Sequence, residues 1–582
     1  MRSFLKIFFA TFLALLVFSV LSVFFAVAFI GGVASKKVPK TPTNAVLAID
    51  LGTKFNEQAR DNFLASLNST DSETPGLYDL IRLIRNAKDD KNISGIYLTA
   101  NSNPNGFAAS DEIRSALNDF KTSGKFIYAY GSVMTQKAYY IANVADSVFL
   151  NPIGMLDWSG MHVEYTFLKG TLDKLGIEPQ IFYAGKFKSA TEPLRLEKMS
   201  PENKLQTSTW LNDLYSHFLE NTAAARKTDT ATLRKLANTA AIQFATDAVA
   251  HKLVDGLKYD DELKDIIKGK LKIDKYEKLN TVNINSYYAS NNYSTGSGEK
   301  IALIYAEGDI IDGKSEDGTI GDITYINLIR KARLDKSIKA VVFRINSGGG
   351  SVLASENIWR ELSITKKEKP VVVSFGDVSA SGGYYVSCDA DSIFALPSTI
   401  TGSIGVFGIV PNLSNFFKGK LGVTFDEVKT GPYAGGLTVT RPMTDAEKRL
   451  QQTQIEVIYA QFKQRVADGR KMDTADVEAI AQGRVWTGKR ALEIGLIDRF
   501  GGIEDAINSA ATLAKLSNYR VAEYPAKINF LDKLLGKGES ESYIKEIKKE
   551  LGADQFAIFE QMQKINRLSG NQAKLPFSFN IR

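Results

Sequence analysis

Cysteine and histidine are almost absent from this chain. Its 582 residues include one cysteine, Cys388, and three histidines. A single thiol excludes an internal disulfide framework and a metal site built from several thiolates. Cys388 is therefore expected to be a small buried apolar residue. The scarcity of histidine also leaves few candidates for the base of a Ser-His-Asp arrangement.

The chain also lacks a long run of basic residues. It has 72 Lys and Arg against 65 Asp and Glu, so its net charge of +7 is spread along the sequence. Such a charge favours solubility and a mild attraction to anionic lipid, and it does not form the concentrated basic patch that nucleic acid requires. A hydrophobic content of 44% over this length is sufficient for two or more domains with apolar cores.

Charge is missing altogether from one stretch near the N-terminus. The segment from Ile7 to Ser35 contains no charged side chain. A membrane-spanning helix needs about 20 apolar residues, whereas the apolar part of a cleavable signal has about 7–15. The uncharged segment is longer than either, so we predict a transmembrane anchor in residues 1–40. Because so little of the chain precedes the span, the body of the protein is expected on the exported side.

Beyond the anchor, short β-branched runs alternate with helical patterns, which predicts an α/β fold. The pattern repeats at a fixed offset: the segment 83–93 aligns with the similar segment 328–338 (328 − 83 = 245), and Tyr139-Tyr140 aligns with Tyr384-Tyr385. Such self-similarity indicates an internal duplication. A stretch rich in Ser, Asn, Tyr and Gly, 286–299, is predicted to be the linker. The predicted domains after the anchor are a first repeat, 41–290, a second repeat, 291–520, and a C-terminal extension, 521–582.

One segment of the second repeat has the pattern of a catalytic turn. The apolar run 371–375 is followed by the segment 376–385, Gly-Asp-Val-Ser-Ala-Ser-Gly-Gly-Tyr-Tyr, which predicts a strand, a tight turn and the start of a helix. A hydroxyl at such a turn lies beside free helix N–H groups that favour developing negative charge. Ser381 is the candidate nucleophile and the Gly382 N–H a candidate oxyanion donor. Alternatively, Gly382 and Gly383 only allow close packing of helix and strand.

The two repeats differ where a catalytic site would lie. Ser381 corresponds to Gln136 in the first repeat, whereas Lys188 of the first repeat corresponds to Ala434 in the second. The second repeat also has a glycine-rich loop after a strand, which could supply a further oxyanion N–H at Gly349. Each repeat therefore lacks what the other one has.

A serine nucleophile needs a base. Lys188 can act as one only if it is neutral, which requires desolvation or a nearby positive field, and its neighbours Phe187 and Ala190 suit a desolvated site. The alternative is that Lys188 is an ordinary surface lysine. A histidine base would have to come from His162, His217 or His251.

Three motifs together resemble a known family. They are Lys-Ser-Ala-x-Glu-Pro at 188–193, Ala-Ser-Gly-Gly-Tyr at 380–384 and Thr-Gly-Ser-Ile-Gly at 401–405. In this order they are typical of the signal peptide peptidase A family, in the long, double-domain form also called protease IV. The resemblance covers nearly all of the chain after the anchor. It implies tandem duplicated ClpP/crotonase-like domains and a membrane-anchored serine protease that degrades cleaved signal (leader) peptides.

The resemblance also implies roles for individual residues. Ser381 would be the nucleophile, Lys188 the general base and Ser403 a hydroxyl that orients the lysine, although a serine in such a turn can equally be structural. Gly348 stands where family members usually have proline, so the loop before Gly349 is expected to be more flexible. The mechanism needs no metal or cofactor. The resemblance further implies a homo-oligomer, a tetramer in the family, in the bacterial inner membrane with its catalytic part on the periplasmic side.

Three other functions remain open at this point. The residues 308–315 satisfy the P-loop pattern, but the acidic residues around them would repel phosphates, and the sequence that follows is a poor helix former. A non-catalytic membrane scaffold is a second alternative. An acyl-CoA enzyme of the crotonase group is a third, for which neither an anchor nor a Ser/Lys pair is expected.

Overall fold

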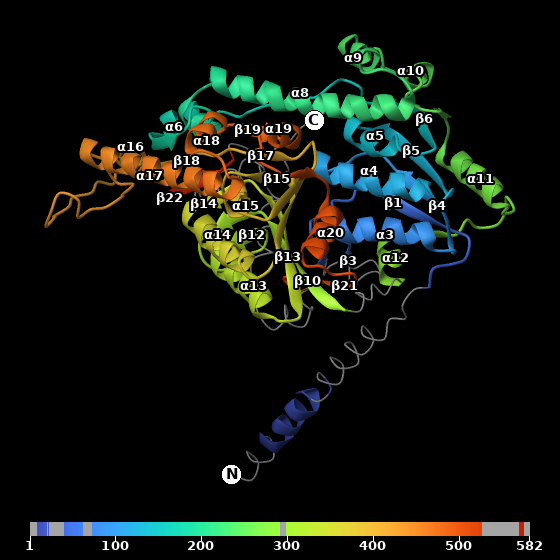
Figure 1. Ribbon diagram of the computed structural model, residues 1–582, viewed down its shortest axis with the longest axis horizontal. Helices are drawn as coiled ribbons and strands as arrows, with labels where there is room; N and C mark the ends of the chain where they lie inside the picture. Colours follow the sequence, from blue (N-terminus) through green and yellow to red (C-terminus); the bar gives the residue numbers. More distant parts are fainter. Residues whose placement is uncertain are drawn as a thin grey trace.

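The computed structural model describes residues 8–19, 21, 40–61, 73–290, 298–526 and 570–575. Figure 1 shows the first half of the chain, blue to green, beside the second half, yellow to red, with the long helix α8 (Pro201–Arg226) lying along one side of both. Helix α20 (Ile503–Leu513) lies between the two halves and packs on the sheet of the second. The larger apolar core extends from the first half into the second.

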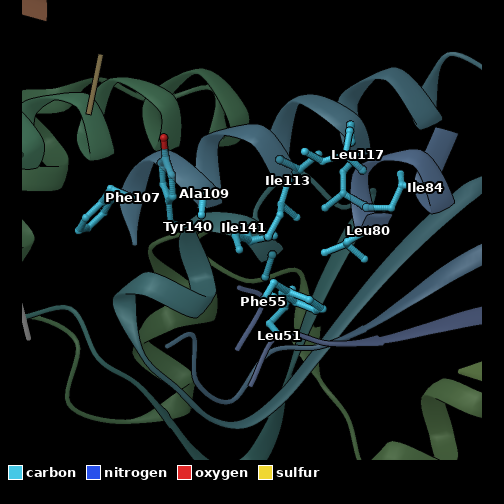
Figure 2. Close-up of a cluster of buried hydrophobic side chains, with 14 of the residues drawn as sticks. Leu51, Phe55, Leu80, Ile84, Phe107, Ala109, Ile113, Leu117, Tyr140 and Ile141 are labelled. Carbon is cyan, nitrogen blue, oxygen red and sulfur yellow. The ribbon is translucent and has the colours of Figure 1, made fainter. Parts of the chain in front are cut away.

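The first repeat is built on a parallel six-stranded sheet with the strand order β8-β6-β5-β4-β1-β9. Helices α3 and α4 pack on it through their apolar faces, and Figure 2 shows Leu80, Ile84, Ile113 and Leu117 meeting in this core. The elements are β1 (Ala45–Asp50), α3 (Leu77–Asp89), β4 (Ile93–Thr99), α4 (Phe107–Lys121), β5 (Phe126–Met134), α5 (Gln136–Ala142), β6 (Ser147–Leu156), β8 (Gly256–Leu257) and β9 (Thr281–Asn283).

The second repeat contains a sheet of the order β19-β17-β15-β13-β10-β21, with β16 and β20 attached beside β15. Its elements are β10 (Glu299–Glu307), α13 (Asp322–Leu334), β13 (Ile338–Ser347), α14 (Val352–Lys366), β15 (Val371–Ala380), α15 (Gly382–Ser387), β16 (Ser392–Ala395), β17 (Ile400–Gly402), β19 (Val485–Thr487), β20 (Arg499–Phe500) and β21 (Tyr519–Tyr524).

The strands of the two repeats correspond at the offset found in the sequence. Strand β13 begins at Ile338 where β4 begins at Ile93, and β15 begins at Val371 where β5 begins at Phe126. The two separations are equal (338 − 93 = 371 − 126) and match that of the repeated sequence (328 − 83). The predicted α/β fold and its duplication are confirmed.

A third sheet joins segments that are distant in sequence, in the order β12-β11-β14-β22-β18-β7. Strand β7 (Glu178–Ala184) of the first repeat pairs along its whole length with β18 (Val406–Asn412) of the second, antiparallel to it. Strand β22 (Gly570–Lys574) lies between β14 (Gly349–Ser351) and β18. The remaining two strands of this sheet are β11 (Asp309–Ile311) and β12 (Thr319–Gly321).

Strands β2 (Arg60–Asp61) and β3 (Glu73–Thr74) form a separate antiparallel pair, and the other elements are helices and turns outside the sheets. They are α6 (Lys169–Leu175), the 3-10 turn η1 (Ser189–Thr191), α7 (Glu192–Arg195), α9 (Thr230–Asn238), α10 (Ala245–Ala250), α11 (Asp260–Leu271), α12 (Ile284–Ser290), α16 (Ser414–Phe416), the π turn η2 (Phe417–Leu421), α17 (Asp445–Arg470), α18 (Thr474–Ile480) and α19 (Gly488–Glu493).

A buried ionic cluster connects the repeats. Arg344 of β13 is fully buried, and its guanidinium donates to Glu57 Oε2 at 2.7 Å and to Glu112 Oε1 at 2.6 Å, both from the first repeat. It also donates to Ser374 Oγ and to the Phe375 carbonyl, each at 2.9 Å. A buried charge needs such partners, so the cluster fixes how the two repeats are placed relative to each other.

Some local predictions differ from the structure. The predicted linker 286–299 begins inside helix α12, because Ile284 and Tyr287 are buried and anchor that segment to the first repeat. Strand β15 continues to Ala380, and helix α15 begins at Gly382, earlier than the sequence pattern suggested.

Much of the predicted anchor lies outside the described residues. Residues 8–19 and 21 are helical, and within the described part of the chain no helix is long and apolar enough to cross a membrane. Most of the predicted C-terminal extension, residues 527–569 and 576–582, also lies outside the described residues.

Candidate active site

Ser381 lies at the sharp turn that connects β15 to α15. Its φ of 56° and ψ of −116° are unusual for a residue with a side chain, and such strain is held by surrounding contacts. Two backbone hydrogen bonds hold this turn: Ser381 N–H donates to the Gly402 carbonyl, and the Ser381 carbonyl accepts from Tyr385 N–H, both at 2.8 Å. The residue is fully buried.

Lys188 comes to this turn from the first repeat. It follows strand β7 and precedes η1, so the pairing of β7 with β18 carries it into the second repeat. Two glycines with positive φ allow the close approach: a Cβ on Gly185 would lie 2.5 Å from the Gln482 carbonyl carbon, and one on Gly483 would lie 2.7 Å from Lys188 Cβ. The Lys188 backbone N–H donates to the Gly185 carbonyl at 3.0 Å.

The side chains of Lys188 and Ser381 are in hydrogen-bond contact. Nζ of Lys188 lies 2.8 Å from Oγ of Ser381, within the range expected for a base and its nucleophile. The lysine is 1% exposed. The interaction joins residues that are 193 positions apart in a single chain.

Ser403 completes the surroundings of the lysine amine. Its Oγ lies 3.1 Å from Lys188 Nζ, and its carbonyl oxygen accepts from the same nitrogen at 3.0 Å. Ser403 has a φ of 52°, and its N–H donates to the Arg484 carbonyl at 2.7 Å, so its position is fixed by the turn after β17. These contacts direct the amine toward Ser381.

Burial lowers the pKa of Lys188 well below its ordinary value. The cause is desolvation, because burial penalises the charged ammonium relative to the neutral amine. A neutral amine has a free electron pair and can accept a proton from a hydroxyl. The arrangement can therefore activate a serine without a histidine.

The two glycine-rich turns beside Ser381 lie against each other. A Cβ on Gly382 would be 3.1 Å from the Gly349 Cα and 2.7 Å from Ser355 Oγ. Gly349 has a φ of 96°, and its N–H donates to Ser347 Oγ at 3.1 Å. A Cβ on Gly383 would be 2.8 Å from the Ser347 carbonyl oxygen. The glycines thus also serve the close packing that the sequence left as an alternative.

Gln206 is a further polar residue of this region, which the sequence did not single out. This fully buried residue of α8 donates through Nε2 to the Phe187 carbonyl at 3.0 Å and to Ser189 Oγ at 2.9 Å, and its Oε1 accepts from Val485 N–H at 3.2 Å. It therefore links the turn that carries Lys188 to the second repeat. A single glutamine within a helical pattern gives no sequence signal of such a role.

The equivalent positions of the two repeats are occupied differently. Gln136, which corresponds to Ser381, donates to the Gly160 carbonyl at 2.7 Å and accepts from Gly160 N–H at 3.1 Å, so its side chain closes that turn. Ala434, which corresponds to Lys188, lies exposed in a loop.

The three histidines lie elsewhere. His217 Nε2 is 3.1 Å from both carboxylate oxygens of Asp111, and His162 and His251 are exposed. The P-loop-like segment 308–315 continues into strand β12, and the next helix, α13, begins only at Asp322. Among the described residues no group of three or more His, Cys, Asp and Glu side chains could hold a metal ion.

A serine on a strained strand-to-helix turn, in contact with a buried lysine whose pKa is lowered, has the form of a Ser/Lys hydrolase site. Residues 119–274 and 363–517 each match Peptidase family S49. "Protease 4" of Salmonella typhi is 37% identical over 79% of this chain and 75% of its own length. "Serine protease SPPA, chloroplastic" of Arabidopsis thaliana is 34% identical over 81% of this chain and 69% of its own length. The chain belongs to Peptidase family S49 and is a serine protease.

A solved structure with a weaker likeness is a ClpP1 mutant from Listeria monocytogenes. It is 14% identical to this chain, with 35% of this chain and 94% of the other covered, at a TM-score of 0.24. At this score the likeness adds nothing to the family assignment.

Proposed function

We propose that this protein is an endopeptidase in which Ser381 is the nucleophile and Lys188 the general base. The observation that carries this proposal is the 2.8 Å contact between Lys188 Nζ and Ser381 Oγ in a fully buried setting. The lowered pKa of the lysine supports it, because a base must be deprotonated to take the serine proton.

The proposed reaction uses this contact in two stages. Neutral Lys188 accepts the proton of Ser381 Oγ, and the oxygen attacks the peptide carbonyl carbon to form a tetrahedral intermediate. The same ammonium returns the proton to the leaving amine. Water, activated by the lysine in the second half of the cycle, hydrolyses the acyl-enzyme and restores both residues.

The negative charge of the intermediate needs hydrogen-bond donors. Gly382 is the first residue of α15, so its N–H has no partner within the helix and lies directly after the nucleophile. Gly349 N–H is the proposed second donor, and its present bond to Ser347 Oγ would have to be exchanged for the oxyanion. Preorganised donors of this kind contribute about 10²–10³-fold to the rate.

We assign Ser403 a positioning role. Its hydroxyl and carbonyl oxygens, at 3.1 and 3.0 Å from Lys188 Nζ, restrict the amine to the side of Ser381. Both oxygens can stabilise the ammonium that forms when the lysine takes the proton.

The proposed substrates are cleaved signal peptides at the bacterial inner membrane, with residues 1–40 as the anchor and the catalytic part exported. The uncharged stretch from Ile7 to Ser35 and the resemblance to signal peptide peptidase A support this proposal. The division into repeats at 41–290 and 291–520, with an extension at 521–582, is proposed with it.

We also propose a homo-oligomer. Exposed apolar side chains are frequent at the end of η2 and in the loop that follows it, and we propose that a second copy of the chain covers them. They include Leu421, Val423, Phe425, Val428 and Leu437. The contact of Lys188 with Ser381 lies within one chain, so each copy would carry its own complete pair.

A serine-reactive fluorophosphonate probe and a fluorogenic peptide test the proposal together. The wild type should be labelled at Ser381 and should hydrolyse the peptide, and Lys188→Ala should lose about 10²–10⁴-fold in rate. Lys186→Ala is the matched control, because Lys186 lies close by in the sequence but is exposed and should keep full activity. Peptide hydrolysis that survives Ser381→Ala would refute the assignment, and a wild type without label or hydrolysis would favour a scaffold.

A further inference from the structure

A segment from the end of the chain lies across the candidate active site. Strand β22 (Gly570–Lys574) is inserted between β14, whose Gly349 borders Ser381, and β18. It is antiparallel to both neighbours: Gly350 pairs with Ala573, and Phe407 pairs with Gln572. An extended segment hydrogen-bonded to exposed strands is a common way in which proteins bind peptides.

The segment presents the carbonyl of Ala573 to the glycine turns of the site. A Cβ built on Gly349 would lie 2.1 Å from the Ala573 oxygen, and one built on Gly382 would lie 3.0 Å from it. These are the two glycines that we propose as oxyanion donors. Ala573 itself is fully buried, so the site holds a small side chain at this place.

Specific contacts fix the segment on both sides of Ala573. Lys574 Nζ lies 2.7 Å from Asp309 Oδ2, and Leu575 N–H donates to the Gly348 carbonyl at 2.6 Å. On the other side, Asn571 Oδ1 accepts from Gln451 Nε2 at 2.8 Å. These contacts set a single register for the strand.

Asn571 also borders a cavity of about 280 Å³. Its wall includes Ile409, Val439 and Gln451. Residues at alternate positions of a strand point to the same side, so the cavity lies beside the side chain two positions before Ala573, which is Asn571.

We propose that residues 570–575 are an internal substrate mimic that occupies the peptide groove and competes with external substrates. This inference rests on the proposed function of Ser381 and Lys188. It also describes the substrate class: an extended peptide bound between β14 and β18, with a small residue at the position of Ala573 and a basic residue after it, opposite Asp309.

Competition by a tethered segment has a defined kinetic signature. A groove that is open in only a fraction of the molecules binds external peptide more weakly by that same fraction. A segment bound about nine-tenths of the time raises the apparent KM about tenfold, whereas kcat is unchanged because saturating substrate displaces the segment.

Steady-state kinetics on the detergent-solubilised chain test this proposal. A chain that ends at residue 569 should show an apparent KM lowered about tenfold with the same kcat. A chain that ends at Leu575 is the matched control and should behave as the wild type. Full-length Ala573→Trp should resemble the shorter chain, because the buried site has no room for an indole. An unchanged KM in both the shortened chain and Ala573→Trp would overturn the proposal.

A binding measurement separates this inference from the proposed chemistry. In Ser381→Ala chains, fluorescence anisotropy measures the Kd of a labelled peptide with the sequence of residues 570–575. The chain shortened to residue 569 should bind it about tenfold more tightly than the full-length chain. Equal Kd values, with hydrolysis intact in the wild type, would overturn the internal mimic alone. Tighter binding without wild-type hydrolysis would support the mimic and refute the proposed peptidase.

Discussion

Replacement of Lys188 by methionine separates the catalytic cost of losing the lysine from its effect on folding. Methionine keeps an unbranched side chain of similar length but has no titratable amine. Without a base, kcat/KM should fall about 10²–10⁴-fold. The folded protein need not suffer in proportion, because the lysine is 1% exposed and burial already penalises its charged form.

The stability effect of this replacement depends on pH, and its sign follows from the lowered pKa. In the unfolded wild type the lysine has an ordinary pKa of about 10.4 and binds a proton that the folded protein does not hold. The unfolded state therefore binds more protons between the two pKa values, and wild-type stability rises by about 1.4 kcal/mol per pH unit there. The Lys188→Met chain lacks this pH-dependent contribution, so its stability falls relative to that of the wild type as the pH rises. The lost hydrogen bonds, at about 1 kcal/mol each, lower its stability at every pH.

Urea unfolding of the wild type and of Lys188→Met between about pH 7 and 9 measures this difference. The stability of the wild type should rise relative to that of the variant across this range. In parallel, wild-type kcat/KM should rise with pH and be lost as the pH falls through the lowered pKa of Lys188. A stability difference that stays constant between about pH 7 and 9 would refute a neutral lysine base.

Three further changes test the surroundings of the pair. Ser403→Ala should lower kcat more than it raises KM, because the lysine amine loses a hydrogen-bond partner at 3.1 Å. The apparent pKa of the activity profile should also move. An unaltered kcat and an unaltered profile would show that Ser403 is only a structural turn residue. Gly382→Val should lower kcat about 10²–10³-fold, since a Cβ there would lie 2.7 Å from Ser355 Oγ and displace the oxyanion donor; normal kcat would contradict that role. Arg344→Met should destabilise the fold by about 3–5 kcal/mol in urea unfolding, because two buried carboxylates lose their partner, and a change below about 1 kcal/mol would show that the cluster does not join the repeats.

The duplication and the α/β fold could be predicted because they depend on local patterns. Apolar runs, turn residues and helical periodicity recur at one fixed offset, and β13 and β15 begin where this offset places them relative to β4 and β5. The turn at Ser381 could also be predicted, because glycines after a strand mark a sharp change of direction. The exact end of strand β15 could not be predicted, since the strand continues past the apolar run through Gly376 and Asp377, and its last three residues, 378–380, pair with β17.

The third sheet could not be predicted from the sequence. Strand β7 of the first repeat joins β18 of the second, and β22 comes from near the end of the chain to join β14. Such pairings depend on which strand edges are open in the folded protein, and local pattern gives no information on that. The same limit applies to Gln206, whose role depends on a carbonyl and an amide brought together from two repeats.

The structure explains why the lysine and the serine of the site can come from different repeats. A catalytic lysine supplied by one repeat is useful to a serine in the other only if their separation is tightly fixed, because a misplacement of about 1 Å can cost 10²-fold in rate. Strand β7 meets this need by pairing along its whole length with β18, directly before Lys188. Buried Arg344 lies on strand β13, which pairs with the strand β15 that leads to Ser381. Its ion pairs with two carboxylates of the first repeat fix β13 to that repeat. Because both connections are internal to one chain, either repeat could lose its own half of the pair without loss of the site.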